Sequence, residues 1–310
     1  MNLPRSRFLK LLGLGMAGVG ARAAEPETLR IGIVTDCQYA DIDTPPKSKR
    51  QYRLSPKKLQ EAVDAFNKMD DLHVALHLGD MIDKDVASYD TVMPIFKKLK
   101  APAHQVIGNH DYSIPDEDKA RVPELMGMKS PYYSFIQNGW KFILLDGNEV
   151  SLFANGKDAE ATKAAKQFQA ATKHRKLPEY CGGLGEKQRG WLEAELKTAK
   201  AAGQKALIFC HYPLLPIGPH SLWDAEAVLE VIKPYADILP AWFNGHNHDG
   251  NYTAAHGIHF LNFRGMVDTE QNTYARMDIT PTLIKVTGFG REPSRELVIP
   301  AKDAPPEAKV

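Results

Sequence analysis

Few cysteines and no internal repeat are the first features of this sequence. Its 310 residues include only Cys37, Cys181 and Cys210, an odd and sparse set that does not form a disulfide framework. One bridge would be possible in an oxidising compartment, but the spacing does not indicate one. A chain of this length buries a sizeable core without cross-links. With no repeat and no clean break between segments, we predict a single domain over residues 29–299.

The sequence also lacks an excess of charge of one sign, because 39 Lys and Arg face 38 Asp and Glu for a net charge of +1. Four of the cations lie in the first 23 residues, which hold no acid, so the remainder has 35 basic and 38 acidic residues and a charge of about −3. A broad nucleic-acid surface needs clustered positive charge. We therefore expect no nucleic-acid partner. Any recognition of phosphate would have to be local, through metals or a few basic side chains.

Long apolar runs are missing beyond the N-terminus. There, an apolar stretch over residues 8–19 follows Arg5 and Arg7 and precedes Ala21-Arg22-Ala23. This order is typical of a secretory signal peptide, and the stretch is too short to span a membrane as a mature helix. We predict that residues 1–23 are such a signal and that the protein is exported, periplasmic or secreted, without a stable membrane span. An uncleaved anchor is the alternative.

What the sequence contains is an early alternation of strands and helices, followed by strands alone. Ser55-Pro56 is typical of a helix start, and Asn138-Gly139 of a hairpin turn. Strands are predicted at 29–35, 72–78, 103–107, 132–137, 140–146, 206–210, 258–263, 273–279 and 282–287, and helices from 55 and at 88–100, 157–176 and 186–202. This order predicts a layered α/β sandwich. Residues 300–310 are expected to be a disordered tail.

Five short polar motifs follow predicted strands, and ligands bind beyond the carboxyl ends of strands in open α/β sheets. The motifs are Asp36-Cys37-Gln38, Gly79-Asp80-Met81-Ile82-Asp83, Gly108-Asn109-His110-Asp111, His211 and Gly245-His246-Asn247-His248. Residues i and i+2 leaving a strand point to the same side. Mixed imidazole, amide and carboxylate ligands suit Mn, Fe, Zn or Co more than Ca. Two such ions about 3.5–4 Å apart clamp a phosphoryl group and generate hydroxide at neutral pH.

Cys37 and the histidines outside these motifs are expected to have no role in metal binding. A buried thiol is the expected state of Cys37 although it lies inside a motif. The remaining histidines are expected to pack in the core or lie on the surface: His73, His77, His104, His174, His220, His256 and His259.

Together, the motifs resemble the calcineurin-like metallophosphoesterase superfamily. Most members begin with Asp-x-His, whereas this chain has Gln38 in place of that histidine, which resembles the manganese-dependent ADP-ribose/CDP-alcohol diphosphatase branch. Further segments similar to that branch are Gln38-Tyr39-Ala40-Asp41, Tyr52-Arg53-x-Ser55, Gly182-Gly183-Leu184-Gly185, Gly265-Met266-Val267-Asp268-Thr269 and Gly288-Phe289-Gly290-Arg291. The resemblance implies an α/β/β/α sandwich with mixed sheets and flanking helices.

Carried over by position, the resemblance also implies roles for individual residues. The implied ligands are Asp36, Gln38 and His248 for one metal, Asn109, His211 and His246 for the other, and Asp80 as a bridge. His110 would face the scissile phosphate, with Asp83 orienting its imidazole. Many members place Arg after the second Asp of Gly-Asp-x-x-Asp. This chain has Lys84 there, which removes the bidentate phosphate contact that Arg offers.

The function implied is hydrolysis of a pyrophosphate bond in compounds of the ADP-ribose or CDP-alcohol type, with a hydroxide between two metals attacking phosphorus in line. The export signal favours an alternative, a broad-specificity phosphodiesterase or phosphomonoesterase. A catalytically silent metal-binding domain is disfavoured because no ligand has been lost. Substrate selection is expected from residues near the motif ends, which could equally pack the core or rim: Tyr39, Tyr112, Trp223, Tyr252 and Arg264.

Gln38 generates the first prediction. Its neutral amide oxygen is a weaker donor than imidazole, which should loosen one metal site and favour the harder Mn over Zn. We expect Gln38→His to shift the Mn/Zn affinity ratio toward Zn, measured by metal titration of both proteins. An unchanged ratio would contradict this interpretation.

Overall fold

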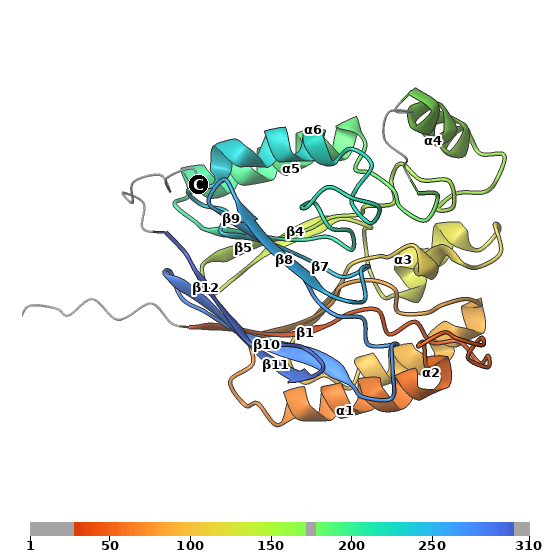
Figure 1. Ribbon diagram of the computed structural model, residues 1–310. Coiled ribbons are helices and arrows are strands. Elements are labelled where there is room, and N and C mark those ends of the chain that lie inside the picture. The colour runs from red at the N-terminus through yellow and green to blue at the C-terminus, as the bar shows by residue number, and fades with distance from the viewer. Residues whose placement is uncertain (1–27, 172–177, 301–310) are drawn as a thin grey trace, which may run out of the picture.

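Two six-stranded mixed sheets stack face to face, and helices cover the outer face of each (Figure 1). The computed structural model describes residues 28–171 and 178–300. The predicted layered sandwich is confirmed. The predicted signal peptide, His174 and all of the predicted tail after Pro300 lie outside the described residues.

The first sheet has a parallel half and an antiparallel half. In the parallel half, β1 (Leu29–Val34), β2 (Val74–His77) and β3 (Ala103–Gln105) lie side by side. The antiparallel half adds β10 (Thr273–Ile279), β11 (Leu283–Gly290) and β12 (Arg295–Val298) beyond β1. The helices that connect the parallel strands, α1 (Ser55–Asn67) and α2 (Val86–Phe96), cover this sheet on the side away from its partner.

The second sheet is parallel in its centre and antiparallel at both edges. Its central strands are β5 (Trp140–Leu144), β6 (Ala206–Phe209), β7 (Ala241–Asn244) and β9 (Ile258–Asn262). The edge strands are β4 (Tyr133–Gln137) and β8 (Asn251–Ala255). Helices α5 (Glu186–Ala201) and α6 (Ala225–Ile232) cover its outer face. Two further helices, α3 (Val122–Leu125) and α4 (Glu160–Ala171), lie in connections before β4 and after β5.

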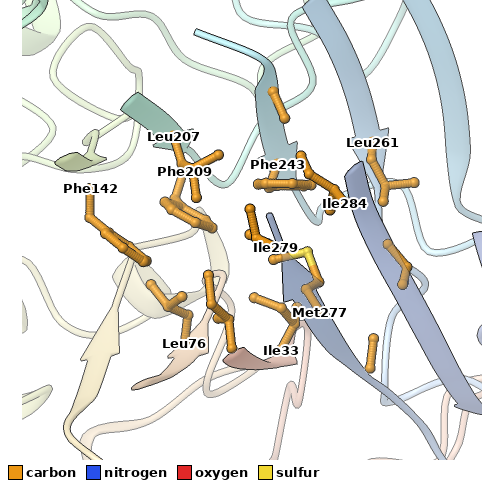
Figure 2. Close-up of a cluster of buried hydrophobic side chains, with 14 of the residues drawn as sticks. Ile33, Leu76, Phe142, Leu207, Phe209, Phe243, Leu261, Met277, Ile279 and Ile284 are labelled. Carbon is orange, nitrogen blue, oxygen red and sulfur yellow. The ribbon is translucent and has the colours of Figure 1, made fainter. Parts of the chain in front are cut away.

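The core between the sheets is built from the inward-facing side chains of both (Figure 2). Ile33 and Leu76 of the first sheet face Phe142, Phe209 and Phe243 of the second, and all five are buried. Burial of this apolar surface holds the two sheets at a fixed separation. The loops at one end of the sandwich therefore start from rigid strands.

Five helices and strands of the described residues were not predicted from the sequence: β7, β8, β12, α3 and α6. Strand β7 has only four residues and is buried throughout, so it shows no alternation. Strand β8 is mostly exposed and polar, and β12 and α6 are short. Helix α2 was predicted at 88–100 but spans Val86–Phe96. Short elements stabilised by tertiary packing leave little periodicity to detect.

The cysteines are all free and buried in the structure. The expectation that they form no disulfide framework is confirmed. Cys37 lies in the apolar cluster beside α1, where burial raises the pKa of its thiol to about 12. It is a packed thiol, as expected.

The central core yields a stability prediction. Phe142 is 0% exposed and stacks on Phe209 at a ring-centroid distance of 5.5 Å. Phe142→Ala should lower the free energy of unfolding by about 3–5 kcal/mol, because it removes buried apolar surface and leaves a cavity. Urea unfolding measures the change. The matched control is Ile136→Ala on the adjacent strand β4, where the side chain is 55% exposed and the expected change is within about 0.5 kcal/mol.

Candidate metal centre

The predicted ligands lie in loops that leave the parallel strands of both sheets. Asp36 follows β1, Asp80 follows β2, and Asn109 lies beyond β3. His211 follows β6, while His246 and His248 follow β7. Because the carboxyl ends of these parallel strands meet at one end of the sandwich, the side chains converge there.

Asp80 is the point where the two sets of predicted ligands meet. Its Oδ2 accepts a hydrogen bond from Gln38 Nε2 at 2.8 Å and lies 3.2 Å from His211 Nε2. Its Oδ1 accepts a hydrogen bond from the backbone N–H of His110 at 2.8 Å. Burial would raise the pKa of this carboxyl, but the charges of His211 and His110 outweigh burial and hold it well below its usual range.

Asp36 and Gln38 connect this centre to His248. Asp36 Oδ1 lies 3.3 Å from His248 Nε2, and Gln38 Nε2 lies 3.1 Å from the same ring nitrogen. The backbone N–H of His246 contacts the Asp36 carboxylate at 3.2 Å. Asn109 directly precedes His110, whose backbone N–H binds Asp80. The structure thus links the side chains of Asp36, Gln38, Asp80, His211, His246 and His248 in one network, and the roles of all seven residues as ligands stay a prediction.

Four of the seven residues have left-handed backbone conformations that are rare outside glycine. The φ angles are 53° at Asp36, 44° at Gln38, 59° at Asp80 and 71° at His246. Such conformations cost free energy and concentrate at functional sites, where surrounding structure holds them in place. Here they turn polar side chains toward one point within the first residues after a strand.

Two motif glycines are required by close approach. A Cβ atom on Gly245 would lie 2.0 Å from Thr35 Oγ1 and 2.5 Å from Asp36 Oδ2. Gly79 has a φ of 97°, and a Cβ there would lie 2.5 Å from His211 Nδ1. These positions explain why the motifs place glycine directly before a ligand residue.

Hydrogen bonds orient His211 and His248 so that one nitrogen of each ring faces the centre. His211 Nδ1 donates to the carbonyl of Leu78 at 2.8 Å, which leaves Nε2 toward Asp80. His248 Nδ1 lies 3.0 Å from Asp268 Oδ1, which leaves Nε2 toward Asp36. Partners of this kind fix the tautomer of metal-binding histidines.

His246 is oriented by sulfur instead of oxygen. Its Nε2 lies 3.4 Å from Cys181 Sγ, and its Nδ1 lies 3.2 Å from His211 Nε2. Burial raises the pKa of the Cys181 thiol, so Cys181 stays protonated. The inward nitrogen of His246 is therefore Nδ1.

The donor set fits divalent cations. Ligand atoms of Asp80, His211 and His246 all lie within 4.8 Å of one another. Two buried acceptors, Gln38 Oε1 and Asn109 Oδ1, have no hydrogen-bond partner. The oxygen and nitrogen of the Gln38 amide exchange places by rotation, which turns the oxygen toward the Asp80 and His248 atoms. Buried oxygens without donors, beside imidazole nitrogens and carboxylates, are what a hard or borderline metal requires.

The electrostatics couple metal binding to proton release. Burial opposes protonation of His211, but the Asp80 carboxylate outweighs it and raises the pKa to about 9. At His248, burial is likewise outweighed, by Asp268 and Asp36, and the pKa rises to about 9. Burial and His211 lower the pKa of His246. Because imidazole binds metal only in its neutral form, cation binding displaces protons from these rings.

The predicted pair of His110 and Asp83 is more exposed than the fully buried pair of His211 and Asp80. His110 Nδ1 is 3.1 Å from Asp83 Oδ1 and 3.4 Å from the Asp83 carbonyl oxygen. Burial lowers the pKa of His110, but the carboxylates of Asp80 and Asp83 outweigh burial and raise it. The arrangement can hold a protonated imidazole at the edge of the site.

Two carboxylates that hold ligand residues in place were not predicted from the sequence. Asp111 accepts hydrogen bonds from the backbone N–H groups of Asp80 at 2.9 Å, Met81 at 2.8 Å and Gly108 at 2.8 Å. It therefore joins the loop after β2 to the loop after β3. Asp268 is the partner of His248. Asp111 ends the Gly-Asn-His-Asp motif, and Asp268 lies in the Gly-Met-Val-Asp-Thr segment. The spacing of these residues in the sequence does not indicate which ligand each of them supports.

The five residues expected near the substrate separate into buried and accessible ones. Trp223 and Tyr112 are buried, and Trp223 Nε1 donates to the Pro178 carbonyl at 3.0 Å. Packing, the alternative role, is the one that the structure favours for both. Tyr252 is exposed and its hydroxyl contacts His259. Arg264 donates to the Arg291 carbonyl, and Tyr39 follows Gln38 on the partly buried rim.

Comparison with known proteins identifies the family of this chain. The sequence profile of the family described as calcineurin-like phosphoesterase matches residues 29–250. The chain belongs to the calcineurin-like phosphoesterase family. This metallophosphoesterase is a metal-dependent phosphoester hydrolase, and the family resemblance predicted from its motifs is confirmed.

Relatives of this phosphoesterase share one name. A manganese-dependent ADP-ribose/CDP-alcohol diphosphatase of Arabidopsis thaliana is 27% identical, with 90% of this chain and 99% of the relative covered. A protein of the same name from Mus musculus is 27% identical over 89% of this chain and 94% of its own. The crystal structure of a dimetal phosphatase from Danio rerio has the same fold, with a TM-score of 0.78, 24% identity, and 88% and 99% of the two chains covered.

In the two described stretches of the phosphoesterase, none of the helices has the length and apolar character that crossing a bilayer requires.

Asp268 generates a prediction for this centre. Asp268→Asn keeps the shape of the side chain but removes the charge beside His248, which should weaken Mn²⁺ binding about 10- to 100-fold. Isothermal titration calorimetry measures the affinity. The matched control is Asp249→Asn, because Asp249 pairs with the same Lys49 as Asp268 but is 77% exposed. Equal affinities in the two variants would contradict the role given to Asp268.

Proposed function

We propose that this phosphoesterase uses two divalent cations, preferably manganese, to hydrolyse the pyrophosphate bond of nucleoside diphosphate-linked compounds of the ADP-ribose or CDP-alcohol type. The observation that carries the proposal is the shared carboxylate of Asp80, which contacts residues of both predicted ligand sets. A carboxylate between two sets of donors is the arrangement that a bridged metal pair needs.

The contacts near Asp80 support the two ligand sets that the family resemblance implies. His248 contacts both Asp36 and Gln38 of the first set. His211 and His246 of the second set contact each other, and Asn109 directly precedes His110, whose backbone N–H binds Asp80. The names of the relatives support the choice of manganese and of nucleotide pyrophosphates.

Two cations held there would neutralise phosphoryl oxygens and lower the pKa of a bound water. The chain itself supplies an acid. His110, whose pKa is raised, can stabilise charge on the phosphoryl oxygens or protonate the leaving oxygen at Nε2, because Asp83 holds its Nδ1. Cleavage of a pyrophosphate then releases two phosphomonoesters.

A second candidate function is supported by the N-terminal segment. The N-terminal segment has the pattern of an export signal, and we propose that the protein acts outside the cytoplasm. An exported enzyme that scavenges phosphate would be a broad-specificity phosphodiesterase or phosphomonoesterase. It would use the same centre on simpler esters.

A substrate panel tests the proposal. Purified protein, stripped of metal and resupplied with Mn²⁺, is given ADP-ribose, CDP-choline, bis-p-nitrophenyl phosphate and p-nitrophenyl phosphate. We expect kcat/KM to be highest for the two nucleotide pyrophosphates. Preference for the simple esters would favour the second candidate and contradict the first.

Variants of the centre control for contaminating activity. Asp80→Ala and His211→Ala should each reduce turnover of the best substrate about 1,000-fold or more, since both remove groups that position the transition state. Asp237→Ala, which removes a surface partner of Lys200, should leave turnover unchanged. Full activity of either centre variant would show that the site is misassigned.

A further inference from the structure

Residues 265–269 form a segment that lies beside the metal centre, in the connection from β9 to β10. The segment carries Asp268, whose Oδ1 is 3.0 Å from His248 Nδ1. Its Val267 N–H donates to the carbonyl of Asp36 at 2.9 Å. The segment therefore touches two predicted ligand residues of one metal, one through a side chain and one through the backbone. A shift of these residues would move the carboxylate that orients His248.

The end of this segment has a strained backbone. Thr269, the residue after Asp268, has a φ of 59°, in the left-handed region that β-branched residues rarely adopt. Such a conformation costs free energy and persists only where neighbouring contacts hold it. The backbone N–H of Thr269 donates to the Lys49 carbonyl at 2.7 Å. The carbonyl groups of the segment are fixed by a different residue.

Lys58, the fourth residue of helix α1, binds these carbonyl groups. Its Nζ donates to the carbonyl of Met266 at 2.8 Å and to that of Asp268 at 3.3 Å, and it also donates to the carbonyl of Thr269. A lysine ammonium has three N–H donors and no acceptor. All three donors therefore have acceptors on one segment, which lies more than 200 residues further along the chain.

The surroundings of Lys58 are otherwise unfavourable for a cation. The residue is 3% exposed, and the N-terminal end of a helix carries a partial positive charge. Burial, followed by the charge of Arg291, lowers its pKa to about 8, so the ammonium is still the main form at neutral pH. A buried charge is costly unless hydrogen bonds compensate for it. The three carbonyl contacts therefore account for a lysine at this buried position.

We propose that Lys58 is a positioning residue of the metal centre, which holds the 265–269 segment so that Asp268 can orient His248. The assignment rests on the ligand role proposed for His248 and adds the contact that supports it from α1. Lys58 acts through Asp268 and does not bind the metal. Lys49 also contacts Asp268, at 3.2 Å, but its side chain is 54% exposed, so water screens that ion pair. The buried contacts of Lys58 therefore determine the position of the segment.

Hydrogen exchange of the metal-free protein tests whether Lys58 holds the segment. Lys58→Met keeps an apolar stem of similar length but removes the three donors. We expect the backbone amides of Val267 and Thr269 to exchange about tenfold faster or more, because local opening of the segment no longer breaks charged hydrogen bonds. The matched control is Lys57→Met, which removes an exposed lysine from the adjacent position of α1 and should leave these exchange rates unchanged.

Titration with Mn²⁺ tests whether the segment acts on the centre through Asp268. Lys58→Met should weaken Mn²⁺ binding about tenfold, at the low end of the range for residues that support metal-binding histidines, and Lys57→Met should not. In the Asp268→Asn background, Lys58→Met should change the affinity by no more than about twofold, because the carboxylate that it positions is already lost. If Lys58→Met does not fold, Lys58→Gln, which keeps amide donors on a shorter side chain, is measured in its place.

Three results would overturn the assignment. Equal acceleration of exchange along the whole chain, or none at Val267 and Thr269, would show that Lys58 does not hold this segment. Faster local exchange with unaltered Mn²⁺ affinity would make the contact structural only. The same loss of affinity with and without the Asp268 carboxylate would show that Lys58 does not act through Asp268. Neither measurement uses a substrate, so a failure of the proposed pyrophosphate hydrolysis would be seen separately, in the substrate panel.

Discussion

The arrangement of the loops at this end of the molecule depends on the contacts of one buried carboxylate, that of Asp80. Three loops from two sheets reach it, through the Gln38 amide, the His211 ring and the His110 backbone. A carboxylate out of water is costly unless it is paired and hydrogen-bonded. The surrounding hydrogen-bond donors offset this free-energy cost of burial, and a bound divalent cation would offset more of it. Asp80 therefore joins the three loops to one another and is also the residue expected to bind the cations.

The rest of the fold keeps this arrangement rigid. The apolar core between the sheets fixes the strand ends, and left-handed residues after β1, β2 and β7 turn the ligands inward at once. Glycines before Asp80 and His246 leave room that a Cβ atom would fill. Behind the ligands, Asp111, Asp268, Cys181 and the Leu78 carbonyl hold backbone or ring nitrogens in place. Strained backbone conformations thus occur together with the hydrogen bonds that stabilise them, as at other functional sites.

Much of this could be predicted from the sequence because its signals were local. Strands such as β1 and β10 are marked by apolar runs or alternation, and each ligand motif follows a strand at short range. The short buried strand β7 has no alternation and was missed, although the motif after it was recognised. Asp268 supports His248, which lies 20 residues before it, and its backbone pairs with Arg50 near the start of the described chain. Long-range pairing of this kind leaves no periodic pattern in one sequence.

Electron paramagnetic resonance of the Mn²⁺-loaded protein shows whether Asp80 bridges two cations. Two manganese ions that share a carboxylate are magnetically coupled, so we expect two bound ions per chain and a coupled spectrum, which Asp80→Ala converts to that of isolated ions. A single bound ion, or two ions with the six-line spectrum of uncoupled manganese in the unaltered protein, would contradict it.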